Sequence, residues 1–129
     1  METLKEYINK HQSNKEKSSE LPIYLDELIS KRGYKKDSEV YNKAGISRQT
    51  WSNMMSGKKP ELKTLIRLVF ALELTTHECK YLLKKAGYTL SSSSELALIF
   101  RYYIENKIYD LDRLNESLEK YGYSDWLIY

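Results

Sequence analysis

The five glycines constrain the fold more than any other feature, because each one stands where a helix would end. Four of them follow a Lys or Arg by one or two residues, in the strings KRGY, KAGI, KAGY and KYGY, and Gly57 follows an apolar pair and Ser56. Basic residues in a last turn complement the helix dipole, and glycine supplies the left-handed residue that closes a helix. No run of alternating β-branched residues lies between turn signals. The pattern predicts an all-α chain.

Between these stops, apolar residues recur at the spacing of amphipathic helices. The helix that follows Pro60 has almost no polar face, so we expect it to be the central core helix. Thr75 and Glu78 have the spacing of a capping box, as do Ser92 and Glu95. The predicted helices cover residues 22–32, 38–44, 48–56, 61–72, 75–86 and 95–106, and a seventh begins near residue 110.

The composition divides the 129 residues into three parts. Residues 1–20 are mostly polar and predict an N-terminal arm. Residues 21–90 hold five of the predicted helices, and we expect them to form one domain that contains a helix-turn-helix. The serine-rich string TLSSSS then leads into residues 91–129, which we expect to be a C-terminal helical extension for dimerisation or partner binding.

The short helix over residues 48–56 has two different sides. Trp51 would anchor its apolar side, together with Met54 or Met55. A helix that is held by packing on one side only can enter the major groove of DNA, which is about 12 Å wide, where arginine pairs with guanine and glutamine or asparagine with adenine. A merely solvent-facing helix is the alternative. The polar side carries Arg48, Gln49, Ser52 and Asn53.

The positive charge of the chain is concentrated around this short helix. The whole chain has a net charge of only +3. Residues 31–59, however, contain eight Lys or Arg and two Asp or Glu, a local charge of +6, whereas the segments before and after them are slightly acidic. A solvated basic face would look the same, but concentration around one candidate helix favours binding to nucleic acid.

Residues 36–74 resemble the lambda-repressor-like helix-turn-helix family of the Xre/Cro type. The resemblance is carried by the strings KAGISR (residues 43–48) and SGKKP (residues 56–60), by Thr50, and by the leucines of the following helix. It implies a compact five-helix domain whose recognition helix is the one over residues 48–56. By resemblance, base contacts fall on Arg48, Gln49, Thr50, Ser52 and Asn53, and phosphate contacts on Ser47, Lys58, Lys59 and Lys36.

Two residues depart from the pattern of this family. Asp37 stands where the family usually has glutamine, and its charge is wrong for approaching phosphate, so we expect it to cap the helix over residues 38–44. Tyr41 stands where the family favours alanine, because the two short helices approach each other closely there. Tyr41 and Trp51 together predict a repacked or wider helix pair, and with it altered DNA geometry or a fold kept for another purpose.

The C-terminal extension is rich in aromatic residues. They either cover the open side of the first and fifth predicted helices, over residues 22–32 and 75–86, or form the interface of a dimer. A recognition helix contacts only a few base pairs, so a specific regulator usually binds as a dimer to two half-sites. A self-complementary aromatic patch suits a twofold dimer. The candidate interface residues are Tyr102, Tyr103, Tyr109, Tyr121 and Trp126.

Several classes of function are not expected from this sequence. Cys79 is the lone cysteine, His11 and His77 lack a cluster of metal ligands, and there is no glycine-rich phosphate loop or catalytic triad pattern. We therefore predict no enzymatic activity, no metal and no cofactor. No stretch approaches the roughly 18 apolar residues of a membrane helix, and the N-terminus lacks a signal-peptide core, which predicts a cytoplasmic protein with no membrane partner.

The sequence as a whole predicts a sequence-specific DNA-binding transcriptional regulator, a repressor of bacterial or phage type. Its partners would be double-stranded DNA and a second copy of the chain in a homodimer. The alternative is a protein-interaction module, an antitoxin or a phage inhibitor of a host protein, that binds a protein partner through the aromatic C-terminal helices.

Overall fold

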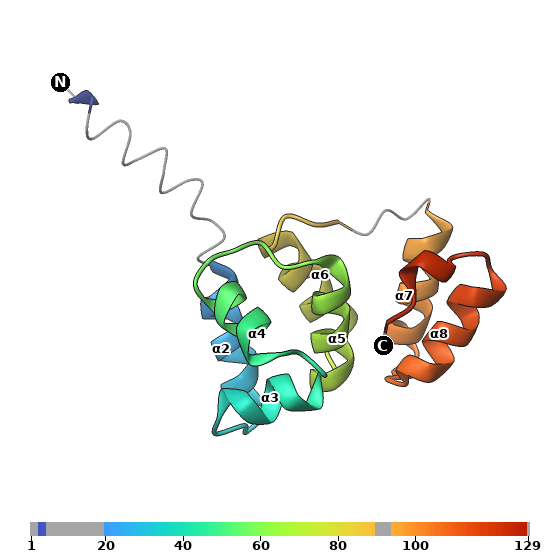
Figure 1. Cartoon of the computed structure of the whole chain (residues 1–129), viewed down its shortest axis with the longest axis horizontal. Helices are drawn as coiled ribbons and strands as arrows, with labels where there is room; N and C mark the ends of the chain where they lie inside the picture. The colour runs from blue at the N-terminus through green and yellow to red at the C-terminus, as the bar shows by residue number, and fades with distance from the viewer. Residues whose placement is uncertain (1–2, 5–19, 90–93, 129) are drawn as a thin grey trace.

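The computed structural model describes residues 3–4, 20–89 and 94–128, and these residues form helices and no strand. The predicted all-α class is confirmed. Helix labels follow Figure 1, in which α2–α6 form one bundle and α7 and α8 form a hairpin beside it. The helices are α2 (Glu20–Lys31), α3 (Asp37–Lys43), α4 (Arg48–Met55), α5 (Leu62–Leu72), α6 (Thr76–Lys85), α7 (Glu95–Glu105) and α8 (Leu111–Lys120), and a 3-10 turn covers Ser124–Trp126.

The helix ends follow the local signals in the sequence. All five glycines have positive φ, between +70° and +104°, and lie just after a helix. At the start of α6, Thr75 and Glu78 form the predicted capping box. At the start of α7 the capping residue is Ser94, whose hydroxyl accepts a hydrogen bond from the amide of Ala97, and not Ser92, which lies outside the described residues.

Helix α5 forms the centre of the bundle, as its apolar sequence predicts. Seven of its eleven residues are buried, and it packs against both α3 and α6. Its side chains join those of α2 and α6 in one hydrophobic cluster that also takes in the underside of α4. Burial of this apolar surface supplies the main driving force for folding the bundle.

The α7–α8 hairpin has its own closing contacts. Tyr103 is only 6% exposed, and its hydroxyl donates a hydrogen bond to the carbonyl of Arg113 at 2.9 Å. The side chain of Asn115 pairs with the backbone N–H and C=O of Ile128, at 2.8 and 2.6 Å. Ile128 is buried, so the apolar end of the chain docks onto the hairpin.

The hairpin packs against α5 and α6 of the bundle. The hydroxyl of Tyr109 donates to the carbonyl of Leu74 at 2.7 Å, and its ring meets that of Phe70 edge to face, with centroids 6.0 Å apart. Lys63 donates to the carbonyl of Asp125 at 2.7 Å. Of the two roles predicted for the C-terminal aromatics, covering the bundle applies to part of them. The contacts of Tyr109 and Trp126, however, fall on α5 and the turn after it, and not on the predicted first and fifth helices, α2 and α6.

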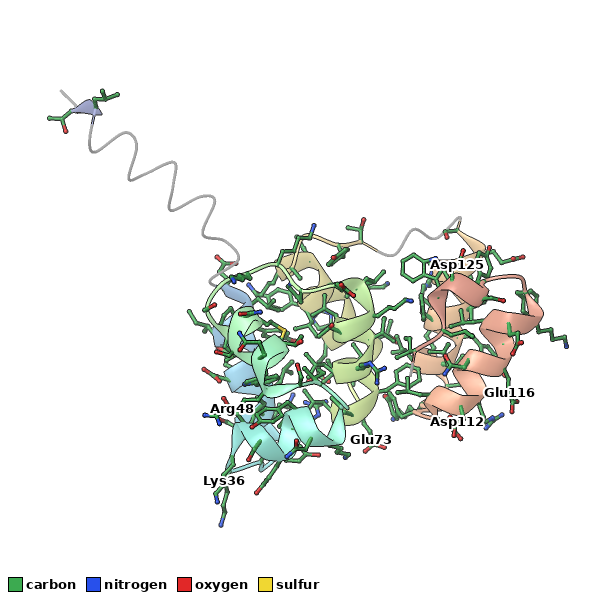
Figure 2. The ribbon with its side chains drawn as sticks, viewed as in Figure 1. Lys36, Arg48, Glu73, Asp112, Glu116 and Asp125 are labelled. Atoms are coloured by element: carbon green, nitrogen blue, oxygen red, sulfur yellow. The ribbon has the colours of Figure 1, made fainter. Side chains whose placement is uncertain are left out.

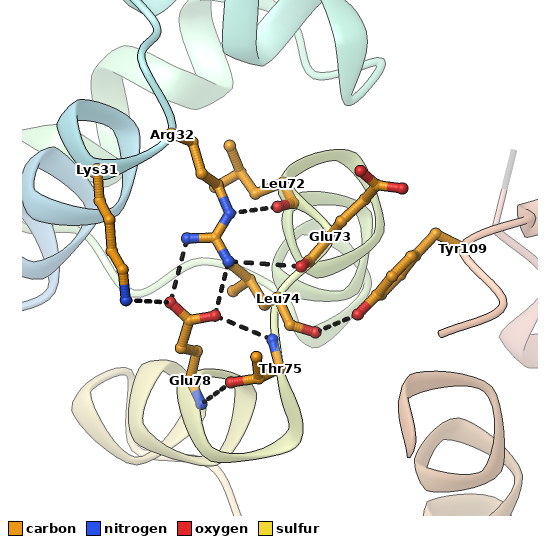
Figure 3. A network of polar contacts seen from close by, with 8 residues as sticks. All are labelled: Lys31, Arg32, Leu72, Glu73, Leu74, Thr75, Glu78 and Tyr109. Atoms are coloured by element: carbon orange, nitrogen blue, oxygen red, sulfur yellow. Dashed lines mark hydrogen bonds and ion pairs between the residues drawn. The ribbon is translucent and has the colours of Figure 1, made fainter. Parts of the chain in front are cut away.

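An ion pair between Arg32 and Glu78 joins the ends of three helices (Figure 3). Arg32, just after α2, donates to both carboxylate oxygens of Glu78, at 2.6 and 3.1 Å, and to the carbonyls of Leu72 and Glu73 at the end of α5. The carboxylate also accepts from the amide of Thr75 at 3.0 Å. These hydrogen bonds, Arg32's foremost, lower the pKa of Glu78 from 4.5 to about 2 although burial raises it.

Replacing this buried carboxylate should destabilise the bundle. We expect Glu78→Gln to lower the free energy of unfolding by about 2–3 kcal/mol at pH 7, because Arg32 loses its charged partner in a buried site. The folded-state pKa of Glu78 lies below its ordinary value. The contribution of its ionised carboxylate to the free energy of unfolding is therefore complete above pH 4.5 and is lost as the pH falls towards 2.

Urea unfolding of both proteins between pH 7 and pH 2.5 measures this effect. The stability difference between wild type and Glu78→Gln should shrink as the pH falls through this range. A difference that stays constant from pH 7 to pH 2.5 would contradict the assignment. Glu73→Gln is the matched control, because Glu73 is exposed and contributes only its backbone carbonyl to the network.

Candidate nucleic-acid interface

Helix α4 is held to the bundle from one side. Trp51 and Met54 are 5% and 1% exposed, and Ile46 just before the helix is 6% exposed. Ser47 caps the helix, since its hydroxyl oxygen accepts from the amide of Thr50 at 3.1 Å. The tight turn before it needs Gly45, where φ is +70° and a Cβ would lie 3.0 Å from the guanidinium of Arg67.

The other side of α4 presents its polar residues to solvent. Arg48, Gln49, Thr50 and Ser52 are exposed and Asn53 is half-exposed. Among the described residues, Arg48 makes no hydrogen bond or ion pair. The amide of Gln49 donates to the side-chain oxygen of Asn53 at 3.1 Å, which leaves an acceptor on Gln49 and two donors on Asn53 available for a ligand. All five predicted base-contacting residues thus lie on one accessible helix.

The predicted phosphate-contacting residues surround this helix. Lys36 immediately precedes α3, and Lys58 and Lys59 follow α4; all three are exposed. In Figure 2, Lys36 and Arg48 extend from the side of the bundle that faces away from the hairpin. Ser47 is exposed too, but its hydroxyl donates to Thr50 at 2.9 Å and so is already engaged within the helix cap.

The two residues that depart from the family pattern are joined through Trp51. The indole N–H of Trp51 donates to the carboxylate of Asp37 at 3.3 Å, and the rings of Tyr41 and Trp51 lie 5.9 Å apart. The prediction that Asp37 caps α3 is wrong, because Lys36 occupies the cap position and Asp37 is the first helical residue. The carboxylate instead helps to fix α4 against α3. The sequence signal for this link was that both departures, Asp37 and Tyr41, fall in α3, which meets α4 at Trp51.

The charge of the chain is divided between the two parts of the structure. Residues 20–89 carry thirteen Lys or Arg and eight Asp or Glu, whereas residues 94–128 carry four and seven. Figure 2 shows Asp112, Glu116 and Asp125 on the hairpin, away from Lys36 and Arg48. A polyanion is therefore attracted to the α3–α4 side and repelled by the hairpin.

The five C-terminal aromatic candidates fall into two groups. Tyr103 is buried within the hairpin, Tyr109 contacts the bundle, and the half-buried ring of Trp126 lies 6.0 Å from the ammonium of Lys63. Tyr102 and Tyr121 are 58% and 55% exposed. The surface available to a partner thus centres on these two, which line a groove between α7 and α8 that also includes the exposed Leu98.

The described residues contain no group of three His, Cys, Asp or Glu that could hold a metal ion. Cys79 is 1% exposed, and burial raises the pKa of its thiol to about 12, so it is not an activated nucleophile. No helix within the described residues has both the length and the apolar character needed to cross a membrane.

Comparison of the chain with protein-family models, with curated proteins and with solved structures finds no match. The resemblance of residues 36–74 to the lambda-repressor-like family therefore stays a prediction.

The link between Asp37 and Trp51 should contribute measurably to stability. We expect Asp37→Ala and Trp51→Phe each to destabilise the protein, and a double-mutant cycle to give a coupling of about 1 kcal/mol for the hydrogen bond between them. Asp37→Asn is the control, because it keeps an acceptor for the indole. Additive effects in urea unfolding would show that the two side chains are not coupled.

Proposed function

We propose that this chain is a sequence-specific DNA-binding transcriptional regulator, a repressor of bacterial or phage type, that inserts α4 into the major groove. The observation that carries the proposal is the two-sided character of α4. Trp51 and Met54 hold it from behind, while Arg48 and Gln49 on its front are exposed. Such a helix can enter the major groove of DNA without any change in the packing of the core.

The chemistry of the exposed side suits base recognition. The guanidinium of Arg48 can donate two hydrogen bonds to the O6 and N7 atoms of guanine. Gln49 and Asn53 together offer the donor and acceptor that adenine requires, and their mutual hydrogen bond limits the rotamer freedom that binding would otherwise cost. Thr50 and Ser52 add hydroxyl groups on the same exposed helix.

The lysines around α4 suit the phosphate backbone. Lys36 lies before α3, and Lys58 and Lys59 lie between α4 and α5, so they flank the helix along the chain. Lysine binds phosphate as a point charge and releases counterions, which supplies affinity on any DNA sequence. In this proposal the chain acts in the cytoplasm, on double-stranded DNA, as a homodimer whose two α4 helices read two half-sites.

Selection of bound duplexes from a random pool tests this function directly. A recovered motif with twofold symmetry would support both base recognition and dimerisation. A pool that shows no enrichment after several rounds, with no salt-dependent binding of random DNA, would refute the proposal.

Removing one base-contacting side chain should change specificity. We expect Arg48→Ala to relax the preference at one base pair of the selected site and to cost about 1–3 kcal/mol there. Lys59→Ala should instead weaken binding to selected and scrambled duplexes alike. Arg113→Ala is the matched control, since Arg113 is an exposed arginine in the first turn of α8 on the acidic hairpin. Fluorescence anisotropy at several salt concentrations measures all three, and equal losses on both duplexes for Arg48→Ala would contradict its role.

The groove on the hairpin favours a second candidate function. Leu98, Tyr102 and Tyr121 are each 46–58% exposed and line one groove, and exposed aromatics of this kind are typical of protein interfaces. The chain would then be a protein-interaction module, an antitoxin or a phage inhibitor of a host protein.

Variants of this groove separate the two candidates. We expect Tyr102→Ala to lower the mass measured by light scattering from that of a dimer to that of a monomer, and to weaken DNA binding through lost dimerisation. An exposed tyrosine outside the groove, Tyr81→Ala, is the control. A wild-type chain that is monomeric, ignores DNA at low salt and forms a tight complex with a purified host protein would favour the interaction module.

A further inference from the structure

Four lysines meet in a hollow beside the proposed DNA-binding helix. Two of them, Lys58 and Lys59, belong to the segment between α4 and α5. The other two, Lys84 and Lys85, form the end of α6, more than twenty residues away along the chain. Among the residues that the structure describes, no carboxylate lines this hollow; its other walls are Leu21, Pro60, Ala86 and Gly87.

The lysines of the hollow differ in how they are held. The ammonium of Lys59 lies 4.4 Å from the ring centroid of Tyr88, whose hydroxyl donates to the carbonyl of Pro60 at 2.8 Å, so a fixed ring positions this charge. Lys85 pairs with Glu20 at 3.0 Å and is largely neutralised. Lys84, like Lys58, is exposed and makes no ion pair with any described residue. Three positive charges thus remain for a ligand.

This hollow is continuous with the polar side of α4. A neighbouring hollow is lined by Thr50 and Asn53 of α4, and it shares Lys58, Lys59 and Pro60 with the lysine hollow. One surface therefore runs from the base-contacting residues, across the α4–α5 segment, to the end of α6. Of the described acidic groups, Glu61 lines the hollow beside α4, and Glu20 is paired with Lys85.

We propose that Lys84 contacts the DNA backbone, on the phosphates that flank the bases read by α4, and so extends the footprint of the protein to the end of α6. This inference rests on the proposed function. A row of separate ammonium groups along one surface matches the repeating charges of a phosphate backbone, and ammonium groups position DNA without reading its sequence. The sequence alone assigns no role to Lys84, because its role depends on the fold that brings α6 beside Lys59.

Salt-dependent binding of Lys84→Gln to the selected duplex tests the inference. Loss of one phosphate contact should reduce the slope of log K against log salt by about 0.9, which corresponds to roughly eight-fold weaker binding at about 0.1 M salt. The loss should be the same on a scrambled duplex. Shortening the duplex from one end should abolish the effect of Lys84→Gln while the effect of Arg48→Ala persists.

Two control variants separate a contact from a general charge effect. Lys120→Gln removes an exposed lysine from the last turn of α8, just as Lys84 lies in the last turn of α6. Lys80→Gln removes an exposed lysine of α6 that does not line the hollow. Both should leave the slope unchanged, and circular dichroism checks that all variants are folded.

The outcomes distinguish this inference from the function on which it rests. If Lys59→Gln lowers the slope but Lys84→Gln behaves like Lys120→Gln, the chain binds DNA and the inference alone is overturned. If the wild-type protein shows no salt-dependent binding of any duplex, the proposed function fails and the inference fails with it. A reduced slope for Lys84→Gln with both controls unchanged supports the contact.

Discussion

The ion pair between Arg32 and Glu78 is the interaction on which the arrangement of the bundle depends. It is largely shielded from solvent, it joins residues 46 positions apart, and through the carbonyls of Leu72 and Glu73 it ties the ends of α2 and α5 to the start of α6. The next carbonyl along the chain, that of Leu74, accepts from Tyr109 and thereby attaches the hairpin at the same point (Figure 3). A charged pair with satisfied hydrogen bonds tolerates few alternative geometries, so it specifies one packing of these elements.

A helix of eight residues could not present a binding surface without such a scaffold. Isolated helices this short are unstable in water. Helix α4 is stabilised at its start by the Ser47 cap, underneath by Trp51 and Met54, and sideways by the bond from Trp51 to Asp37. Because all of these contacts lie on one side, the opposite side remains rigid and open, which is the property that recognition of a DNA groove requires.

The fold also separates positive from negative charge, because its two parts carry net charges of opposite sign. The bundle is basic and the hairpin acidic, and the hairpin packs on the side of α5 and α6 rather than near α4 (Figure 1). The lysines of the α4–α5 segment and of α6 then add to the charge around α4. In the proposed function, this asymmetry would orient the protein before any specific contact forms.

The sequence by itself determined the local structure: the all-α class, the ends of the helices, the caps at Ser47 and Thr75, and the open polar side of α4. These follow from interactions within about four residues along the chain, which helix spacing makes readable. Only the tertiary structure decided that Asp37 binds Trp51, that Tyr103 is buried while Tyr102 is exposed, and that Lys84 lies beside Lys59. Those outcomes depend on how whole helices pack, and residues distant in the sequence carry no local signal of which neighbours they will meet.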